Sequence, residues 1–334
     1  MAEGGTLTFS NPDAYAAAFA DVRLNLTITG AGDFRARLTS LKLNLLGFYQ
    51  CREDLPRIAY MRLPPGQLFL SFPASNAALT FNGFALRAGD IILHARGGRM
   101  HHRIGGRSHW GLISVSPEQL ASHSAALTGE PFTPPDTDKI LRPARPDTAR
   151  FRRLFEQACH LSEVGQNLIE RPEVARALGQ EMLHAVIHCL AADQIDDASK
   201  TRRQHAAIMS RFEEALDRHF DRKLNLPALC AEIGVAERTL RMCCAEFLGV
   251  SPMRYLLLRR LNKARSALRR ADPSIVSVAE VARNHQFLEL GRFSVTYRNT
   301  FGESPSATLQ REPRPQLAGK AMALSTRSGP KPSA

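Results

Sequence analysis

The sequence predicts a two-domain protein, with a β-rich N-terminal domain closed by two helices and an all-helical C-terminal domain. Its 334 residues suit two domains of ordinary size, each able to bury its own core. Apolar residues come in short, strand-like runs in the first third and at helical spacing in the remainder. The formal net charge of +12 lies almost wholly in the C-terminal part, so the two domains differ in surface chemistry.

Composition narrows the class of protein. Hydrophobic residues make up 44% and charged residues 23%, which is typical of a globular chain. No apolar run reaches the length of about 18 residues that spans a bilayer, and the N-terminus lacks the basic and apolar regions of a secretory signal. The six cysteines are scattered without a CxxC pair, which argues against a disulfide scaffold or zinc ribbon. We therefore expect a cytoplasmic protein that makes no membrane contact.

The N-terminal domain is expected at residues 1–190. From residue 24 to 115, alternating apolar runs separated by Pro- and Gly-containing turns predict antiparallel strands in a barrel or sandwich, β-rich to about residue 120. From about residue 146 the period becomes helical and predicts two amphipathic helices. Such helices either cover the sheet or pair with a second chain. The polar stretch 191–204 is the predicted linker.

The C-terminal domain, expected at residues 205–312, begins with a helix-turn-helix pattern. Asn225 can cap a first short helix, Gly234 supplies a tight turn, and a second helix follows from about Glu237. The exposed face of this second helix presents Arg238, Thr239, Arg241 and Met242. Arginine can bind guanine through two hydrogen bonds, and threonine can contact a base or a phosphate. A plain helical hairpin with a solvated face is the alternative for a single match.

A second unit of the same kind follows about 50 residues later. Its turn is formed by Gln286 and Phe287, and a helix from about Glu289 is expected to be buried through Phe293 and Tyr297. The outer face of that helix carries Arg292, Ser294, Val295 and Arg298. The two units end alike, in FLGVSP and TFGESP. This repetition favours two DNA-reading units over a chance hairpin.

A basic helix joins the two units. Residues 252–274, with an apolar stripe at Leu256, Leu257, Leu261, Ala264 and Leu268, predict a helix of about 20 residues. It would be roughly 30 Å long, close to the rise of about 34 Å for one turn of DNA. Two recognition helices at its ends could therefore enter successive major grooves. Arg254 and Arg259 on this helix are expected to contact the phosphate backbone, or else water.

The distribution of charge agrees with this assignment. Residues 1–200 carry a net charge of +1, whereas residues 201–312 carry +7 and the tail 313–334 adds four basic residues and no acidic one. Positive charge confined to the C-terminal part indicates that this part meets a polyanion. The alternative is a basic surface that only keeps the protein in solution. The proline-containing tail 313–334 is expected to be disordered.

At these residues the sequence resembles the AraC/XylS family of bacterial transcription regulators, over about residues 211–310. The resemblance rests on Gln286-Phe287, on Phe293, and on the run Phe301-Gly302-Glu303-Ser304-Pro305. It implies base contacts from Arg238, Arg241, Met242, Gly291, Arg292, Ser294 and Val295. Phosphate contacts are expected from Thr239, Arg254, Arg259 and Arg298.

Three residues depart from the family pattern. Gln286 replaces the usual turn glycine, which implies either a turn with negative φ or local strain. Ala236 replaces the usual Ser or Thr that caps the first recognition helix, at a cost of about 1 kcal/mol. Met242 stands where arginine is common and cannot donate a hydrogen bond. These changes bear on DNA affinity and on the role of Met242.

For the N-terminal domain the resemblance implies a cupin-like sensor and dimerisation module. The resemblance also implies that the protein is a transcriptional activator located at the nucleoid. Its expected partners are double-stranded DNA, RNA polymerase, a second copy of the chain and a small-molecule effector. One alternative is a cupin-type metal enzyme with a DNA-binding appendage. Such enzymes bind their metal through a His-x-His pair, which the chain lacks. The adjacent His101 and His102 would face opposite sides of a strand. The second alternative is a nucleoid protein that binds DNA without sequence preference.

We predict no catalytic residue, metal ligand or cofactor. Aromatic residues that could line an effector pocket, or simply form the core, are Phe48, Tyr49, Tyr60, Phe69, Phe72 and Trp110.

Overall fold

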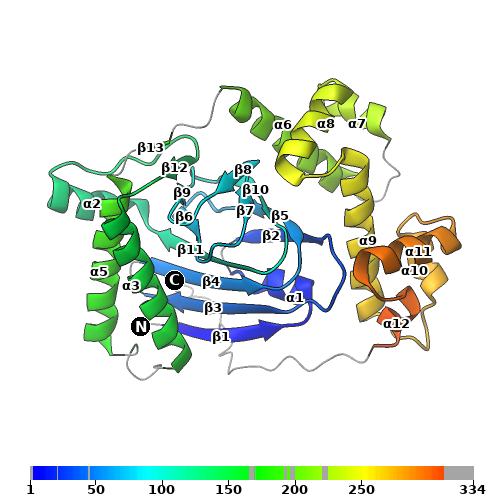
Figure 1. Cartoon of the computed structure of the whole chain (residues 1–334), viewed down its shortest axis with the longest axis horizontal. Helices are drawn as coiled ribbons and strands as arrows, with labels where there is room; N and C mark the ends of the chain where they lie inside the picture. Colours follow the sequence, from blue (N-terminus) through cyan, green and yellow to red (C-terminus); the bar gives the residue numbers. More distant parts are fainter. Residues whose placement is uncertain are drawn as a thin grey trace, which may run out of the picture.

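The computed structural model describes residues 3–20, 22–43, 46–164, 169, 171–191, 194–195, 200–219 and 225–311. The predicted tail 313–334 and part of the predicted linker lie outside these residues. A β-sheet domain and a helical domain lie side by side (Figure 1). This arrangement confirms the predicted fold class of a β-rich N-terminal domain with packed helices and an all-α C-terminal domain.

Two antiparallel sheets form the N-terminal domain. The larger has the strand order β1-β3-β4-β11-β6-β9-β12-β13 and the smaller β2-β5-β10-β7-β8. The strands of the larger sheet are β1 (Glu3–Phe9), β3 (Ala36–Lys42), β4 (Leu46–Glu53), β6 (Leu68–Pro73), β9 (Ile91–Leu93), β11 (Ser108–Val115), β12 (Lys139–Leu141) and β13 (Gln194–Ile195). Those of the smaller sheet are β2 (Arg23–Ile28), β5 (Arg57–Arg62), β7 (Leu79–Phe81), β8 (Phe84–Leu86) and β10 (Arg99–Ile104).

The larger sheet is buried on both faces. Along β11, Trp110 and Leu112 belong to the core shared with the smaller sheet, whereas Ile113 and Val115 belong to a second core. Successive side chains of a strand point to opposite faces, so β11 carries buried apolar side chains on both faces. The second core lies beneath the helices that cover this sheet (Figure 1).

The described residues of this domain also form the helices α1 (Pro12–Ala17), α2 (Pro117–Thr128), α3 (Arg145–Val164) and α5 (Pro172–Leu190). α3 and α5 are the two predicted amphipathic helices, and the rings of Phe151 and Phe155 each lie 4.8 Å from that of Phe72. The sequence analysis did not single out α1, α2 or β12. The short strand β13 lies inside the predicted linker and pairs with β12.

The C-terminal domain consists of helices. They are α6 (Lys200–Arg218), α7 (Leu226–Ile233), α8 (Glu237–Leu248), α9 (Pro252–Arg270), α10 (Val278–Asn284), α11 (Leu290–Phe301) and α12 (Pro305–Leu309). The first unit, α7–α8, and the second, α10–α12, lie at opposite ends of α9 (Figure 1). α6 begins within the predicted linker, five residues before the expected start of the domain.

The buried stripe of α9 differs from the prediction in part. Leu261, Ala264 and Leu268 are buried as expected, but Tyr255 and Leu258 complete the stripe, while Leu256 and Leu257 are only half-buried. A helix with three neighbouring leucines admits two overlapping stripes, and contact with the N-terminal domain selects between them. Leu256 and Leu257 lie at the edges of this stripe, partly buried and packed against the adjoining core clusters.

In the interface between the two domains, α9 packs on β2, and α6 and α8 contact β10. Leu261, Ala264 and Leu268 of α9 belong to the same apolar core cluster as Leu24 and Ile28 of β2. Polar contacts complete the interface. The backbone N–H of Ile28 donates to Asn262 Oδ1 at 2.9 Å, and Asn262 Nδ2 donates to the carbonyl of Ile28 at 3.0 Å.

A buried carboxylate on α6 interacts with both domains across the interface. Glu213 Oε1 lies 2.8 Å from His101 Nε2 of β10 and accepts a hydrogen bond from the Tyr255 hydroxyl at 2.7 Å. Its other oxygen accepts from Arg259. One side chain thus connects the β domain to two helices of the C-terminal domain.

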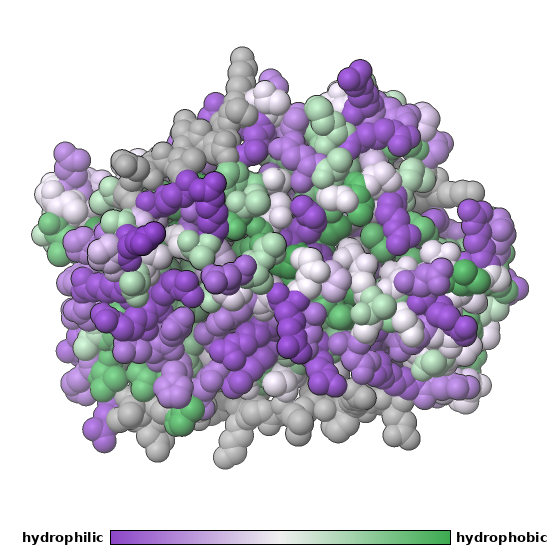
Figure 2. All heavy atoms as spheres, viewed as in Figure 1, coloured by the Kyte–Doolittle hydropathy of each residue, from purple (hydrophilic) through white to green (hydrophobic). Residues whose placement is uncertain are grey.

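The face of the molecule seen in Figure 2 is mainly polar. Figure 2 shows a largely hydrophilic face on which hydrophobic side chains are scattered. Within the described residues, no helix is long and apolar enough to cross a membrane.

Candidate nucleic-acid interface

The turn of the first unit is a left-handed helix end at Gly234. Its φ is 68°, a region that glycine enters without steric penalty. The N–H of Gly234 donates to the carbonyl of Ala231 at 3.3 Å, and the N–H of Val235 to that of Cys230 at 3.0 Å. These bonds end α7 and direct the chain into α8.

The second unit repeats this turn bond for bond. Gln286 has a φ of 63°; its N–H donates to the carbonyl of Arg283 at 2.8 Å, and the N–H of Phe287 to that of Ala282 at 2.9 Å. The residue spacings are the same as at Gly234. The sequence left open whether Gln286 has a negative φ or is strained; the structure shows the strained, left-handed conformation.

The helix starts and exits repeat as well. Asn225 and Ser277 cap α7 and α10 with their side chains, whereas α8 and α11 have no side-chain cap; this confirms the missing cap at Ala236. α8 and α11 both end at a left-handed glycine, and a Ser-Pro pair then starts the next helix. The two serines accept from backbone N–H groups, Ser251 from Arg254 at 3.3 Å and Ser304 from Ala307 at 3.1 Å. The repetition seen in the sequence is therefore a repetition of structure.

The outer face of α8 carries the predicted residues. Arg238, Arg241 and Met242 are exposed and Thr239 is half-buried; Met242 keeps 51% of its surface exposed. The opposite face buries Leu240, Cys243, Cys244 and Phe247. Arg241 Nε donates to Glu237 one turn earlier at 2.8 Å, which aligns its guanidinium along the outer face.

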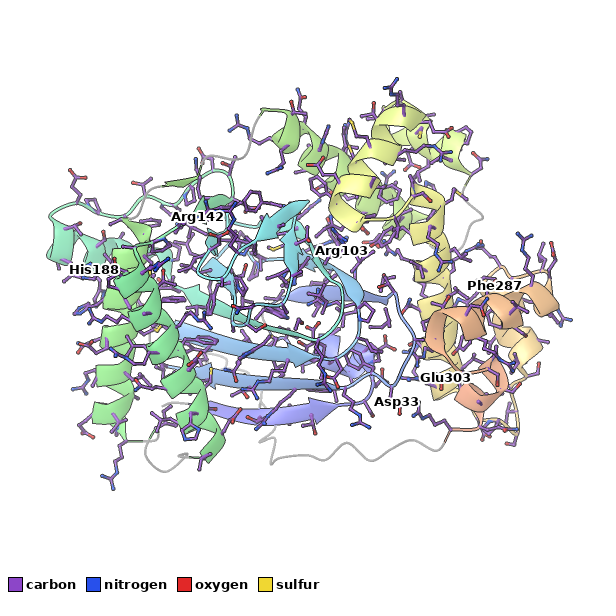
Figure 3. The ribbon with its side chains drawn as sticks, in the orientation of Figure 1. Asp33, Arg103, Arg142, His188, Phe287 and Glu303 are labelled. Atoms are coloured by element: carbon purple, nitrogen blue, oxygen red, sulfur yellow. The ribbon has the colours of Figure 1, made fainter. Side chains whose placement is uncertain are left out.

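The outer face of α11 is built in the same way. Phe293, Tyr297 and Phe301 are buried, and Phe287 stacks on Phe293 with ring centroids 4.7 Å apart; Figure 3 shows Phe287 in the second unit. The predicted contact residues Gly291, Arg292, Ser294, Val295 and Arg298 are all exposed. The neighbouring Leu288, 78% exposed, was missed by the sequence analysis, although an apolar residue directly after a buried turn residue is a usable signal.

Arg254 and Arg259 have different environments. Arg254 is exposed at the start of α9. Arg259 is bound to Glu213 and, at 3.0 Å, to Asp217, and its side chain is only 13% exposed. Arg259 therefore faces the interface between the domains, and we remove it from the expected phosphate contacts.

The adjacent cysteines of α8 are buried thiols. Burial raises the pKa of Cys243 to about 11 and that of Cys244 further. Both thiols are therefore protonated at neutral pH and are poor nucleophiles.

The other predicted candidates lie in the β domain. His101 and His102 face opposite sides of β10, towards Glu213 and Arg57. Phe48, Tyr49, Tyr60, Phe69, Phe72 and Trp110 are all buried in the cores. In the described part of the chain, no group of three or more His, Cys, Asp or Glu side chains is placed to hold a metal ion.

Residues 229–311 match the family model described as a helix-turn-helix domain. A "Probable thc operon regulatory protein" of Rhodococcus erythropolis is 40% identical over 160 residues, covering 48% of this chain and 48% of that protein. The "XylDLEGF operon transcriptional activator 2" of Pseudomonas putida is 35% identical over 99 residues, covering 30% of this chain and 63% of that protein. The C-terminal domain is a helix-turn-helix domain, and its sequence is similar to those of these operon regulators. The predicted resemblance is confirmed.

The matches to AraC/XylS relatives are partial. The chain covers about half of the Rhodococcus protein and less than two thirds of the Pseudomonas protein. Among solved structures, that of the "AraC-like transcriptional activator CuxR" is similar, with a TM-score of 0.41 and 16% identity over 78% of this chain and 95% of that chain. The names of the Rhodococcus and Pseudomonas proteins describe operon regulators.

The strained turn gives a first prediction. Replacing Gln286 by glycine should raise the free energy of unfolding by about 0.5–1 kcal/mol, since relief of the left-handed conformation exceeds the added entropy of the unfolded chain. Gln286 Oε1, buried without a hydrogen-bond partner in the described structure, adds to the gain. Urea denaturation measures the change. In the matched turn, Gly234→Gln should destabilise; a loss of stability in Gln286→Gly would contradict the assigned strain.

Proposed function

We propose that this chain is a transcription regulator that binds DNA sequence-specifically through α8 and α11 in two successive major grooves. The observation that carries the proposal is the same turn, built twice, at opposite ends of α9. The 19 residues of α9 give a length of about 28 Å. That length suits the separation of about 34 Å between grooves on one face of DNA.

The exposed side chains suggest distinct roles. Arg238, Arg241 and Arg292 can each bond the O6 and N7 atoms of guanine, and Ser294 can bond a base edge. Met242 and Val295 offer apolar contact to a thymine methyl, and Gly291 lets the helix approach closely. Thr239, Arg254 and Arg298 are the proposed phosphate contacts, which set position and affinity without reading sequence.

Activation is the proposed direction of regulation, because the Pseudomonas putida relatives are named transcriptional activators. RNA polymerase and a second copy of the chain, paired through the N-terminal domain, are the proposed protein partners. A small-molecule effector is proposed as the signal.

Selection of random-sequence duplex DNA by the full chain tests this function. We expect a motif with two half-elements about one helical turn apart, bound with an affinity that falls as salt is raised. Recovery of no motif, with binding that only fades with salt, would establish the sequence-blind alternative.

Arg292 gives a prediction on the selected duplex. Arg292→Ala should weaken binding by about 1–3 kcal/mol and relax the preference at one base position, because a bidentate base contact is lost. Arg298→Ala is the matched control on the same helix. It should weaken binding to the selected and to random duplexes equally, as expected for a phosphate contact. Equal loss on both duplexes from Arg292→Ala would refute the base contact.

A further inference from the structure

Two apolar side chains are exposed at the N-terminal end of the second recognition helix. Leu288 is 78% exposed, the highest fraction of any large apolar side chain among the described residues, and Val295 is 61% exposed. Leu288 directly precedes Glu289, the N-cap of α11, and Val295 lies in the second turn of this helix. Apolar surface in contact with water is unfavourable, so a partner that covers these side chains would be bound favourably.

Packing within the protein does not explain Leu288. An apolar residue just before the N-cap commonly packs on the fourth residue of the helix, which is Phe293 in α11. Phe287 takes that place here, with its ring centroid 4.7 Å from that of Phe293. The N–H of Phe287 donates to the Ala282 carbonyl at 2.9 Å and fixes the backbone beside Leu288. Leu288 is therefore held in place but stays outside the core.

Gly291 is not required by the fold either. A Cβ atom at this position would meet no other atom within 4 Å, and the residue lies in the first turn of α11. Glycine in a helix is less favourable than alanine, so this residue costs stability without a structural need. Gly291 and Val295 are four residues apart and share a helix face. The missing side chain thus leaves open space beside the exposed apolar residues.

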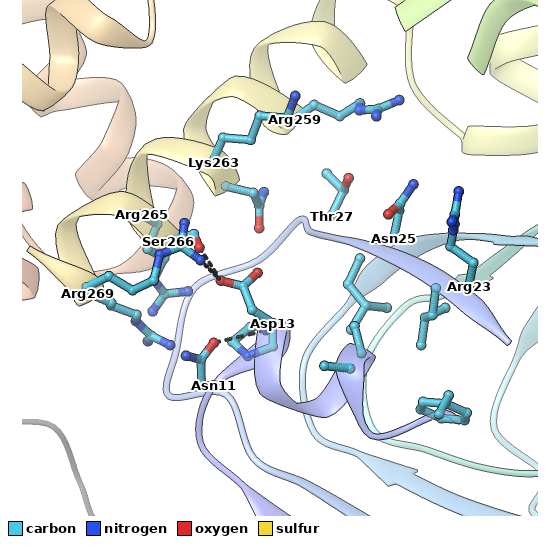
Figure 4. A pocket seen from close by; sticks show the side chains of 18 of the residues that line it. Asn11, Asp13, Arg23, Asn25, Thr27, Arg259, Lys263, Arg265, Ser266 and Arg269 are labelled. Atoms are coloured by element: carbon cyan, nitrogen blue, oxygen red, sulfur yellow. Dashed lines mark hydrogen bonds and ion pairs between the residues drawn. The ribbon is translucent and has the colours of Figure 1, made fainter. Parts of the chain in front are cut away.

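Contacts with the N-terminal domain leave this end of α11 open. The N–H of Gly32 donates to the Phe301 carbonyl at 3.2 Å, at the opposite end of the helix. In the cleft between the domains, Asp13 accepts a hydrogen bond from Ser266 of α9 (Figure 4). The N-terminal residues of a recognition helix are the ones that contact base edges. The exposed apolar end of α11 therefore lies where the proposed DNA site would meet it.

The major groove offers one apolar group to such a surface. All base pairs present hydrogen-bonding atoms there, and thymine adds its C5-methyl group. An apolar side chain placed on the donors and acceptors of another base would remove water from them without replacing its hydrogen bonds, which is unfavourable. An exposed leucine at this position would thus favour thymine and disfavour the other bases.

We propose that Leu288 is a specificity-determining residue, which packs together with Val295 on thymine C5-methyl groups while Gly291 provides the space for this close approach. The inference rests on the proposed DNA-binding function and deepens it, because it assigns a feature of the DNA sequence that α11 reads. Leu288 adds a contact to those of Arg292 and Arg298, which are exposed on the same helix.

Deoxyuridine substitution tests the contact, because deoxyuridine pairs as thymidine does but lacks the C5-methyl group. Each thymine of the duplex selected by the full chain is replaced in turn, and the affinity is measured by fluorescence anisotropy. We expect at least one replacement to weaken binding about fourfold, the factor that corresponds to about 0.8 kcal/mol for one buried CH2 group. A selected duplex in which no replacement changes the affinity would overturn the proposal.

Leu288→Ala assigns the methyl contact to its residue. The variant should weaken binding of the selected duplex about fourfold or more. The deoxyuridine replacement that weakens binding by the wild type should then have little further effect, because both changes remove the same contact. Leu127→Ala replaces a leucine of α2 that is 47% exposed, and this matched control should bind both duplexes as the wild type does. Wild-type affinity in Leu288→Ala would overturn the proposal and leave Leu288 to a protein partner.

Gly291→Ala separates a functional glycine from a structural one. The variant should raise the urea midpoint of unfolding, because alanine favours a helix more than glycine does. It should nevertheless weaken binding of the selected duplex several-fold, because the added methyl group occupies the space beside the bases. Unchanged affinity would overturn the close approach assigned to Gly291.

The same measurements distinguish this inference from the proposed function. Selection that recovers no motif would refute sequence-specific DNA binding, and the thymine contact with it. A motif whose recognition depends on Arg292 but on neither a thymine methyl group nor Leu288 would leave the proposed function intact and refute the thymine contact alone.

Discussion

Replacing Glu213 by alanine should lower the free energy of unfolding by about 3–5 kcal/mol, because it leaves a buried cation without its principal partner. The Glu213 side chain is fully buried, and its two oxygens serve His101, Tyr255 and Arg259. Among the described residues, the partly exposed Asp217 remains as the carboxylate partner of Arg259. Urea denaturation of the full chain measures the loss, and separate unfolding of the two domains is expected as the interface weakens.

The neighbouring residue Glu214 provides the control. It pairs with Arg99 across the same interface, but the two side chains are 42% and 43% exposed. Glu214→Ala should therefore cost less than about 1 kcal/mol. If the two alanine variants lose the same free energy of unfolding, the buried contacts of Glu213 stabilise the fold no more than the exposed pair of Glu214 and Arg99 does.

The free energy of unfolding that Glu213 contributes should also depend on pH. Burial alone would raise the pKa of Glu213, but the charge of Arg259 and the hydrogen bonds from His101 and Tyr255 lower it to about 2. Because this pKa lies below the unfolded value of about 4.3, the stabilisation is present above that value and is lost as the pH falls towards 2. The Glu213→Ala variant should lack this part of the acid-dependent loss.

Arg57→Met should be the second strongly destabilising substitution, again by about 3–5 kcal/mol. Arg57 and Glu53 are both fully buried, with Arg57 Nε 2.6 Å from Glu53 Oε2. The same carboxylate accepts from the Tyr15 hydroxyl at 2.7 Å and from Trp110 Nε1 at 3.0 Å. Removing the arginine leaves a buried carboxylate with no cation, and thermal or urea denaturation measures the cost.

A double variant separates loss of charge pairing from loss of packing. In Arg57→Met/Glu53→Gln, the amide oxygen still accepts from Tyr15 and Trp110, but no buried charge remains. The double variant should therefore be more stable than Arg57→Met alone by at least about 1 kcal/mol. A double variant less stable than the single one would show that the cost arises from packing.

The helix-turn-helix units could be predicted because their signals are local. Gly234, the buried phenylalanines and the two Ser-Pro pairs lie within a few residues of the turns and caps that they form. The strand pattern likewise predicted a double-sheet or barrel domain. By contrast, β12 and β13 have three and two residues, which is too short for a periodic signal, so pairing across the fold determines them.

The assignments that failed depend on contacts between distant residues. Arg259 was assigned to DNA because the sequence shows its charge but not the face of α9 that meets β2. Glu53 and Arg57 lie four residues apart at the ends of two strands and give no sign that they are buried together. For the aromatic residues of the β domain, the sequence left open an effector pocket or the core, and the structure places them in the core. Only the tertiary fold distinguishes these cases.

Asn262 has a consequence for self-association. β2 is an edge strand of its sheet, and the Asn262 amide occupies both backbone groups of Ile28 as a neighbouring strand would. Edge strands with free N–H and C=O groups are templates for pairing with another chain. Separation of the domains would uncover this edge, so closure of α9 onto β2 also protects the protein from strand-mediated aggregation.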